Sequence, residues 1–455
     1  MPPWIQESTR PFDPGRRALG IAAAAAVAAS MSNWRPVSAM GTRGLDAGQW
    51  RANFPALDQR IGEWPLTYLD SAATTQRPTA VIDALIDFYR NDNANPGATL
   101  HTLARRAYER YEGARVALAR FINAASPEEI VWVRGTTEGV NLVATAWARS
   151  RLRSGDEILI TVAEHASNLL PWRLAANATG ARLRFIDVDD EGRLSLEDLD
   201  RKLSARTRLV AFSHVSNVAG YINPAAEICA RARQAGARVF VDAAQSAPHV
   251  TLDVQAIGCD FLAFSSHKML GPMGVGVLWA RREMLDEMPP YQAGSNMAHD
   301  IDLGSQSLEQ AARKFGAGTP NVSGPIGLAA AVSYMSTIGH ETIERHEAGL
   351  TAHALKGLAT VPGLRLLGPR TPEQRIPVFT FTLEAMPALE ILQRLDAKGI
   401  AIRAGDLSAL PLLHRFGATT AARASCYLYT STGDIDRLIG ALLRIAGGHG
   451  RSGQS

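Results

Sequence analysis

The strongest constraint on the fold is an alternation of short apolar runs with helical patterns between about residues 130 and 280. The runs are Glu157–Val162, Arg182–Val188, Leu209–His214, Arg238–Val241, Phe261–Ser265 and Val275–Ala280. Helical patterns such as Ser195–Leu203 and Pro224–Ala235 lie between most of them. Strands separated by helices form right-handed βαβ units, which give a largely parallel sheet covered on both faces. The sequence therefore predicts an α/β fold.

The pattern changes after about Gly324. A long helical pattern extends to about Leu358 with a break near Gly339, and Ile376–Leu383 then alternates apolar residues with threonine. This alternation predicts a strand with one face in solvent. Further predicted elements are a helix at Ala388–Lys398, strands at Ile400–Arg403 and Arg423–Tyr429, and a helix capped by Ser431.

These patterns predict two domains. We expect a large domain over residues 66–330 and a smaller C-terminal α+β domain over residues 331–447, followed by a tail at 448–455. Residues 40–65 are expected to pack with the small domain.

Residues 1–39 differ from the rest. Arg16 and Arg17 precede a run of small apolar residues from Ala18 to Met31, and a V-x-A pattern ends at Ala39. This arrangement resembles a twin-arginine export signal, which would direct the protein to the periplasm. The alternatives are an over-extended reading frame with Met40 as the true start, an alanine-rich helix, or a disordered tail, with the protein then cytoplasmic. In each case these residues lie outside the fold.

Composition excludes several classes of function. The 47 basic and 44 acidic residues leave a net charge of +3, which does not favour a nucleic-acid partner. The three cysteines, Cys229, Cys259 and Cys426, form no CxxC pair, which argues against a cysteine-rich zinc site or a disulfide framework. No run of 18 uncharged apolar residues predicts a membrane span. No metal site is expected.

One lysine stands out chemically. Ser265–Lys268 follows a predicted strand and leads into the glycine-rich turn Gly271–Gly276. Glycine lets a backbone approach a ligand closely, and lysine forms Schiff bases with carbonyl cofactors. The glycines match neither a dinucleotide-binding fingerprint nor a P-loop. A surface lysine beside an ordinary turn is the alternative.

Other polar residues are predicted at the same edge of the sheet. Asp242 lies at the end of an apolar strand. There its carboxylate would either bind a pyridinium nitrogen or cap the N-terminus of a helix. Arg134–Glu138 opens a helix after a strand, which favours either a phosphate site or an ordinary cap. His165 follows the strand that begins at Glu157.

Together these segments resemble the fold-type I pyridoxal-phosphate (PLP) enzymes of the class V aminotransferase family, and most closely its type II cysteine desulfurase/selenocysteine lyase branch. The resemblance covers about Leu45 to Gly447. Its matching segments are Tyr68–Thr75, His101–Leu103, Arg134–Glu138, Glu164–His165, His214–Val218, Asp242–Gln245, Ser265–Lys268, Gly318–Asn321 and Arg423–Ser425.

The resemblance implies pyridoxal 5′-phosphate as the cofactor. Lys268 would form the Schiff base with it and later move the substrate's Cα proton. Asp242 would bind the pyridinium nitrogen and Gln245 the phenolic oxygen. His165 would stack on the ring, and Asn217 would lie near its face and the substrate carboxylate.

The resemblance also implies residues for the phosphate, the substrate and a partner. Thr137, Ser265 and His267 would hold the phosphate, helped by the backbone amides of Thr136 and Thr137. Arg423 would bind the substrate carboxylate, a pairing that suits the guanidinium fork. Members of the family are homodimers in which the loop containing Thr319 reaches the neighbour's phosphate, so a homodimer is expected.

The sequence departs from this family in a catalytic loop. The family's loop carries a nucleophilic cysteine five residues after an arginine, and here Arg403 is followed by Ser408 at that position. Asp406 and Leu407 replace two histidines, and a His-Arg pair is missing from Asn95–Thr99. A persulfide needs a thiolate, which a serine hydroxyl cannot supply. Cys426 is an unsuitable substitute, because strand alternation turns it away from Arg423.

We therefore expect a PLP-dependent enzyme that acts on an amino acid through an external aldimine and Cα deprotonation. The leading hypothesis is a C–S or C–Se lyase that does not transfer a persulfide. The same scaffold also permits an aminotransferase, an epimerase or a decarboxylase. Two further hypotheses are a true cysteine desulfurase that uses another thiol and a non-catalytic PLP-binding partner protein.

Overall fold

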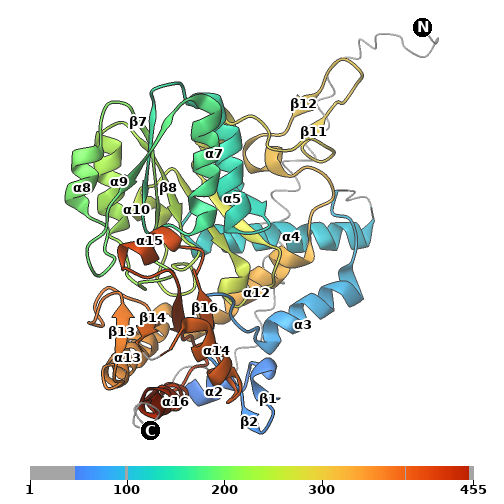
Figure 1. The fold of residues 1–455 in the computed structure, drawn as a ribbon. Coiled ribbons are helices and arrows are strands. Elements are labelled where there is room, and N and C mark those ends of the chain that lie inside the picture. The colour runs from blue at the N-terminus through green and yellow to red at the C-terminus, as the bar shows by residue number, and fades with distance from the viewer. Residues whose placement is uncertain (1–46, 98–100, 385, 450–455) are drawn as a thin grey trace. The chain divides into compact units, whose positions relative to one another are not determined.

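The computed structural model describes residues 47–97, 101–384 and 386–449. Its large domain is built on a seven-stranded sheet with the order β4-β10-β9-β8-β7-β5-β6 (Figure 1). The strands are β4 (Ile130–Val133), β5 (Glu157–Thr161), β6 (Arg182–Ile186), β7 (Thr207–Ser213), β8 (Arg238–Asp242), β9 (Phe261–Ser265) and β10 (Gly276–Ala280). All pairs are parallel except those of β10, which is antiparallel to β4 and β9. The predicted α/β fold with a largely parallel sheet is confirmed.

Both faces of this sheet are buried. Along β9, Phe261 and Ala263 contribute to one apolar core, while Leu262 and Phe264 contribute to the other. Helices α5 (Thr136–Leu142) and α7 (Leu170–Thr179) cover the first core, and α8 (Leu196–Lys202) and α9 (Ala225–Gln234) cover the second (Figure 1). A strand covered on both sides has no polar face, which explains the continuous apolar runs in the sequence.

The remaining elements are helices and short hairpins. The helices are α2 (Ala47–Arg51), α3 (Thr79–Asp87), α4 (Thr102–Phe121), α6 (Arg149–Arg151), α10 (Val254–Ile257), α11 (Arg282–Glu287), α12 (Ser323–Ile338), α13 (His340–Leu358), α14 (Ala388–Asp396), α15 (Leu410–Arg415) and α16 (Thr432–His449). The hairpins are β1 (Arg60–Ile61) with β2 (Trp64–Pro65), and β11 (Ala298–His299) with β12 (Ser307–Leu308). Gly339 separates α12 from α13 at a φ of 87°, as the break in the helical pattern predicts. Ser431 Oγ accepts a hydrogen bond from Asp434 N at 3.2 Å, which confirms the predicted cap of α16.

The small domain contains an antiparallel sheet with the order β13-β14-β17-β16. Its strands are β13 (Leu364–Leu367), β14 (Val378–Leu383), β16 (Arg403–Gly405) and β17 (Ala421–Ser425). A separate parallel pair joins β3 (Thr67–Tyr68) to β15 (Ile400–Ala401). The single strand predicted at residues 400–403 is therefore wrong, because Ala401 and Arg403 belong to different sheets.

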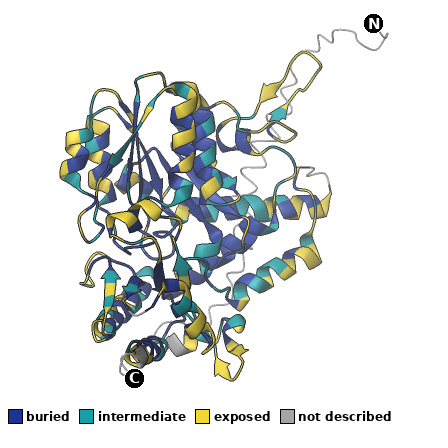
Figure 2. Ribbon diagram, in the orientation of Figure 1, coloured by how far each residue is buried: buried dark blue, intermediate teal, exposed yellow. Residues whose placement is uncertain are grey.

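The prediction that β14 has one face in solvent is also wrong. Thr380 is fully buried, and its hydroxyl donates a hydrogen bond to Val218 O at 2.7 Å. Val218 belongs to a loop of the large domain, so that domain covers this face of β14 at Thr380, while Thr382 is half-buried. Figure 2 shows this region of β14 as buried. Thr380 makes a polar contact between the domains, which the alternation of residues in the sequence does not distinguish from exposure to solvent.

The predicted strand at residues 423–429 ends early, at Ser425. Beyond it Tyr427 N donates to Thr430 Oγ1 at 3.0 Å, which forms a turn in place of further strand pairing. None of the helices in the described part of the chain has the length and hydropathy that a membrane span requires. The predicted export signal at residues 1–39 lies outside the described part of the chain.

Candidate active site

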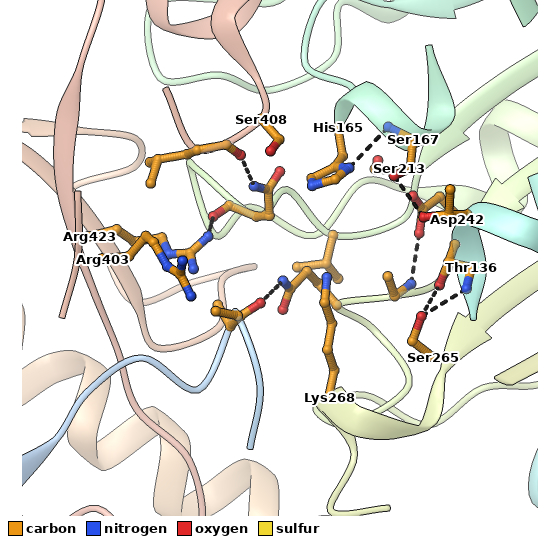
Figure 3. Close-up of a pocket in the computed structure, with 18 of the residues that line it drawn as sticks. Thr136, His165, Ser167, Ser213, Asp242, Ser265, Lys268, Arg403, Ser408 and Arg423 are labelled. Carbon is orange, nitrogen blue, oxygen red and sulfur yellow. Dashed lines mark hydrogen bonds between the residues drawn. The ribbon is translucent and has the colours of Figure 1, made fainter. Parts of the chain in front are cut away.

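A cavity of about 390 Å³ lies where the carboxyl ends of the large-sheet strands meet the small domain (Figure 3). The predicted site residues that line it are Thr136, Thr137, His165, Asn217, Asp242, Gln245, Ser265, His267, Lys268, Ser408 and Arg423. They come from the ends of different strands and from the small domain. Parallel strands place their carboxyl ends at one edge of a sheet, which explains why residues far apart in sequence converge there.

Lys268 extends into the middle of this cavity (Figure 3). Burial lowers the pKa of its amine from 10.5 to about 8, with the Asp242 carboxylate opposing the shift and the Arg423 guanidinium adding to it. A larger fraction of the amine is therefore unprotonated near neutrality than for an exposed lysine. Such an amine can act as a nucleophile or accept a proton.

Asp242 lies at the end of β8 and is buried. Its Oδ1 accepts a hydrogen bond from Ala244 N at 2.8 Å, and within the described residues Oδ2 accepts none. Burial raises the pKa of this carboxyl, while the bond from Ala244 and the positive charge of Lys268 act in the opposite direction. A cation placed beside Oδ2 would stabilise the carboxylate form.

One corner of the cavity consists of hydroxyl groups and backbone amides. Thr136 N donates to Ser265 Oγ at 2.8 Å, and the Thr136 hydroxyl lies 2.8 Å from the same oxygen. Thr137 Oγ1 donates to Ser167 Oγ at 2.8 Å. The corner lies at the start of α5, where the helix dipole favours an anion.

The glycine-rich turn has a different role from the one predicted, because none of its glycines lines the cavity. A Cβ on Gly276 would lie 2.5 Å from Phe264 O and 2.7 Å from Gly135 Cα. Gly276 therefore permits β10 to pack against the backbone beside Thr136, and it positions the hydroxyl corner indirectly.

His165 contributes an imidazole ring to the cavity. Its Nδ1 accepts a hydrogen bond from Ser167 N at 3.1 Å. Burial, with the nearby cations Lys268 and Arg423, lowers the His165 pKa to about 4. The ring is therefore neutral near pH 7, which suits stacking against another flat ring.

Glu164 fixes the backbone beneath this histidine. It is almost fully buried and accepts hydrogen bonds from Ser213 Oγ and Asn168 Nδ2, both at 2.6 Å. Burial raises the pKa of Glu164 to about 7 although these donors lower it. With a third, from Thr161 Oγ1, these hydrogen bonds join β5, β7 and the segment that carries His165.

A carboxylate that the sequence patterns did not single out holds two arginines at the cavity. Asp70 Oδ2 lies 2.9 Å from Arg403 Nη2, and its Oδ1 lies 3.4 Å from Arg423 Nη2. Arg423 also donates to Asn217 O at 3.1 Å, but its buried Nε has no partner among the described residues. Arg423 and Arg403 lie side by side in Figure 3. The sequence feature that could have identified Asp70 is its position within the Tyr68–Thr75 segment, which matches the family.

The loop after β16 forms one wall of the cavity. Ser408 O accepts a hydrogen bond from Ala166 N at 2.7 Å, and Asn217 Nδ2 donates to Leu407 O at 3.0 Å. Asp406, Leu407 and Ser408 all line the cavity. Asn217 thus contacts the loop, a role that the sequence did not suggest.

The cysteines lie elsewhere. All three are buried, and none lines the cavity. Cys426 packs in the small-domain core with Phe379 and Phe381, and burial raises the pKa of its thiol. Burial also raises the pKa of Cys229, to about 12. None of these thiols is positioned to react in the cavity.

Thr319 is the one predicted site residue that the structure leaves outside the cavity. Its hydroxyl accepts a hydrogen bond from Asn95 Nδ2 at 3.2 Å. It lines a second hollow of about 390 Å³, together with Arg134 and Asn321. Its predicted role at a neighbouring subunit's phosphate remains a prediction.

The residues present fit pyridoxal phosphate. The cavity offers a lysine amine of lowered pKa, a buried carboxylate for a ring nitrogen, and a hydroxyl corner for a phosphate. Two buried polar atoms, Gln245 Oε1 and Arg423 Nε, lack partners among the described residues, as expected where a polar ligand binds. No cluster of potential metal ligands occurs in the residues that the structure describes.

This fold and site define a PLP-dependent enzyme of fold type I. Residues 67–438 match the family described as aminotransferase class-V, and the chain belongs to this family. A probable cysteine desulfurase from Halalkalibacterium halodurans is 45% identical over 394 residues, which cover 87% of this chain and 96% of that protein. A cysteine desulfurase from an Enterobacter species is 46% identical over 396 residues, covering 87% and 97%.

Solved structures agree with this assignment. The cysteine desulfurase CsdA of Escherichia coli has a TM-score of 0.81 and 37% identity, covering 88% of this chain and 98% of its own. A variant of C-DES with glycine covalently linked to its PLP cofactor has a TM-score of 0.75 and 25% identity, covering 86% and 98%. The protein is thus a PLP-dependent, cysteine desulfurase-like enzyme.

Proposed function

We propose that this enzyme removes a sulfur or selenium substituent from the β-carbon of an amino acid without forming a persulfide on itself. The observation that carries the proposal is the position of Ser408 in the cavity wall, with all three thiols buried elsewhere. A serine hydroxyl is scarcely ionised near neutrality and cannot accept sulfane sulfur. The relatives named cysteine desulfurases support cysteine, or its selenium analogue, as the substrate type.

The residues have distinct proposed roles. Lys268 would hold the cofactor covalently, and its amine would then take the proton from the substrate Cα. Asp242 would keep the ring nitrogen protonated, and Gln245 would bind the phenolic oxygen. PLP, when bound, draws electrons away from Cα and so permits bonds at Cα and Cβ to break.

Other residues would position the two ligands. Thr136, Thr137, Ser265 and His267 would hold the phosphate, and the neutral His165 would stack on the ring. The unpartnered Nε of Arg423 would bind the substrate carboxylate. Asn217 would support this guanidinium through its carbonyl oxygen and the loop through its amide.

For cysteine the balanced reaction is an elimination. Cysteine and water give pyruvate, ammonia and hydrogen sulfide, so no oxidant or reductant is needed. The Cα proton goes to Lys268, and the C–S bond breaks with its electrons leaving on sulfur. A desulfurase would instead give alanine and a persulfide.

Product analysis tests this proposal. The PLP-loaded enzyme is incubated with cysteine, and sulfide, pyruvate, ammonia and alanine are quantified, with Lys268→Ala as the inactive control. We expect sulfide, pyruvate and ammonia in equal amounts. Alanine as the main product would favour the second candidate, a cysteine desulfurase using another thiol, which the names of the relatives support.

We also infer a homodimer. Its support is the location of Thr319, which the family resemblance places at a phosphate but which lies outside the cavity of its own chain. In a dimer, Thr319 of one subunit would reach the cavity of the other subunit.

A further inference from the structure

The cavity contains one carboxylate without a cationic partner. Of the two aspartates in its lining, Asp242 is close enough to Lys268 for each to shift the pKa of the other. Asp406 forms no ion pair within the described residues, and its Oδ1 accepts a hydrogen bond only from Ser408 N, at 3.0 Å. It is close enough to His165 to oppose the lowering of that pKa. Asp406 thus supplies an uncompensated negative charge on the loop side of the cavity.

The two arginines nearby share one carboxylate. Asp70 binds both Arg403 and Arg423, so these three groups together carry one net positive charge. In the proposed reaction the carboxylate on the substrate Cα would balance that charge. A substrate side chain reaching toward the loop would then meet Asp406, which has no ion-pair partner among the described residues.

The loop that carries Asp406 is held in place through the two residues that follow it. Ser408 O and Leu407 O accept hydrogen bonds from Ala166 N and Asn217 Nδ2. The Leu407 side chain is buried in an apolar cluster that includes residues of the large domain. Leu407 and Ser408 have φ values of 52° and 53°, a conformation that L-residues adopt only where the surroundings enforce it. The loop is therefore a fixed wall.

We propose that Asp406 determines substrate specificity: it selects amino acids with a neutral or cationic side chain and rejects those with an anionic one. The inference rests on the proposed function, because it takes Arg423 as the site for the carboxylate on Cα. Asp406 is exposed on the cavity wall, so solvent screens its charge in part, but two like charges a few ångströms apart still repel. The group rejected is an ionised β-substituent, such as a carboxylate or a sulfinate.

Asparagine and aspartate form a suitable pair of probes, because they have nearly the same shape and differ in one negative charge. Binding of each to the PLP-loaded enzyme is measured from the change in cofactor absorbance and from the shift in Tm. 2,3-Diaminopropionate supplies a cationic side chain. The same titrations are made with Asp406→Asn, and with Asp396→Asn as a control that removes an exposed charge outside the cavity.

We expect asparagine and diaminopropionate to bind the wild-type enzyme at least about 10-fold more tightly than aspartate. Asp406→Asn should bring the asparagine-to-aspartate ratio close to one, and Asp396→Asn should leave it unchanged. An unchanged ratio in Asp406→Asn would overturn the inference. So would a ratio near one in the wild-type enzyme.

The inference and the proposed function can fail separately. Selective binding of asparagine without sulfide release from cysteine would retain the inference and contradict the proposed function. Sulfide release from cysteine without discrimination between asparagine and aspartate would retain the proposed function and contradict the inference. Absence of any response to all three amino acids, in absorbance and in Tm, would overturn the inference, while the proposed function would still be decided by product analysis with cysteine.

Discussion

At the scale of single residues, burial shifts the pKa values of several ionisable groups in and beside the cavity. The Lys268 pKa is lowered to about 8, the His165 pKa is lowered to about 4, and the Glu164 pKa is raised to about 7. In each case burial disfavours the charged form and is the largest cause. These shifts make the lysine reactive and the histidine neutral near pH 7, and such groups cluster at functional sites.

The Lys268 pKa predicts how cofactor loading depends on pH. Only the unprotonated amine attacks an aldehyde, so the rate at which PLP loads the cofactor-free protein should rise with pH and level off above about 8. Asp242 raises this pKa, so Asp242→Asn should move the midpoint to lower pH. Stopped-flow absorbance measures both profiles. A midpoint near the ordinary lysine value would show that the amine is not buried as described.

Asp70 is expected to act through the arginines. Asp70→Asn removes the charge that holds Arg403 and Arg423, so the KM for an amino-acid substrate should rise by about 10-fold, with a smaller change in kcat. Steady-state kinetics on the loaded enzyme measures both constants, and Asp396→Asn is the control. An equal fall in kcat at constant KM would mean that Asp70 has a role in the chemical step.

Several residues of this site can be predicted from the sequence, because side chains with suitable chemistry stand at the ends of recognisable strands. A lysine, an aspartate and a histidine at the ends of apolar strands predict a shared edge, and the structure brings Lys268, Asp242 and His165 to it. Asp70 and the loop contact of Asn217 could not be predicted in this way. Both depend on how the small domain meets the large one, and that contact leaves no periodic signal in the sequence.

At the scale of elements, predictability follows burial. Strands β5 and β7 to β10 are apolar on both faces and stand out in the sequence, whereas β14 resembles a half-exposed strand until Val218 is seen to cover Thr380. The loop between β16 and α15, which lines the cavity, is irregular. Its conformation depends on hydrogen bonds to Ala166 and Asn217 rather than on a local pattern.

This fixed loop predicts that a thiol alone does not restore sulfur transfer. Ser408→Cys places the thiol beside Asp406, whose negative charge raises the thiol pKa and disfavours the thiolate. We expect at most weak persulfide formation with cysteine, measured by mass spectrometry. Ser408→Cys combined with Asp406→His should give more, while Leu407 is kept because it is buried. Robust persulfide on the single variant would show that the loop is competent for transfer.

At the scale of the whole molecule, the site lies between two domains and is proposed to require a second subunit. Light scattering during size-exclusion chromatography should give twice the mass of one chain. Thr319→Val should weaken PLP retention on dialysis, although Thr319 lies outside its own chain's cavity. Asn91→Ala, which removes an exposed hydrogen bond to Asp87 at the C-terminal end of α3, serves as a control. A monomer that retains PLP fully would contradict the dimer.

The central claim is that this chain has a cysteine desulfurase scaffold without its sulfur-carrying step. The most direct measurement is the intact mass of the PLP-loaded wild-type enzyme after incubation with cysteine and no reductant, followed by peptide mapping. We predict released sulfide and no added sulfur atom on Cys229, Cys259 or Cys426. A persulfide on the wild-type enzyme, mapped to Cys426 or another cysteine, would contradict this claim and make the protein a sulfurtransferase.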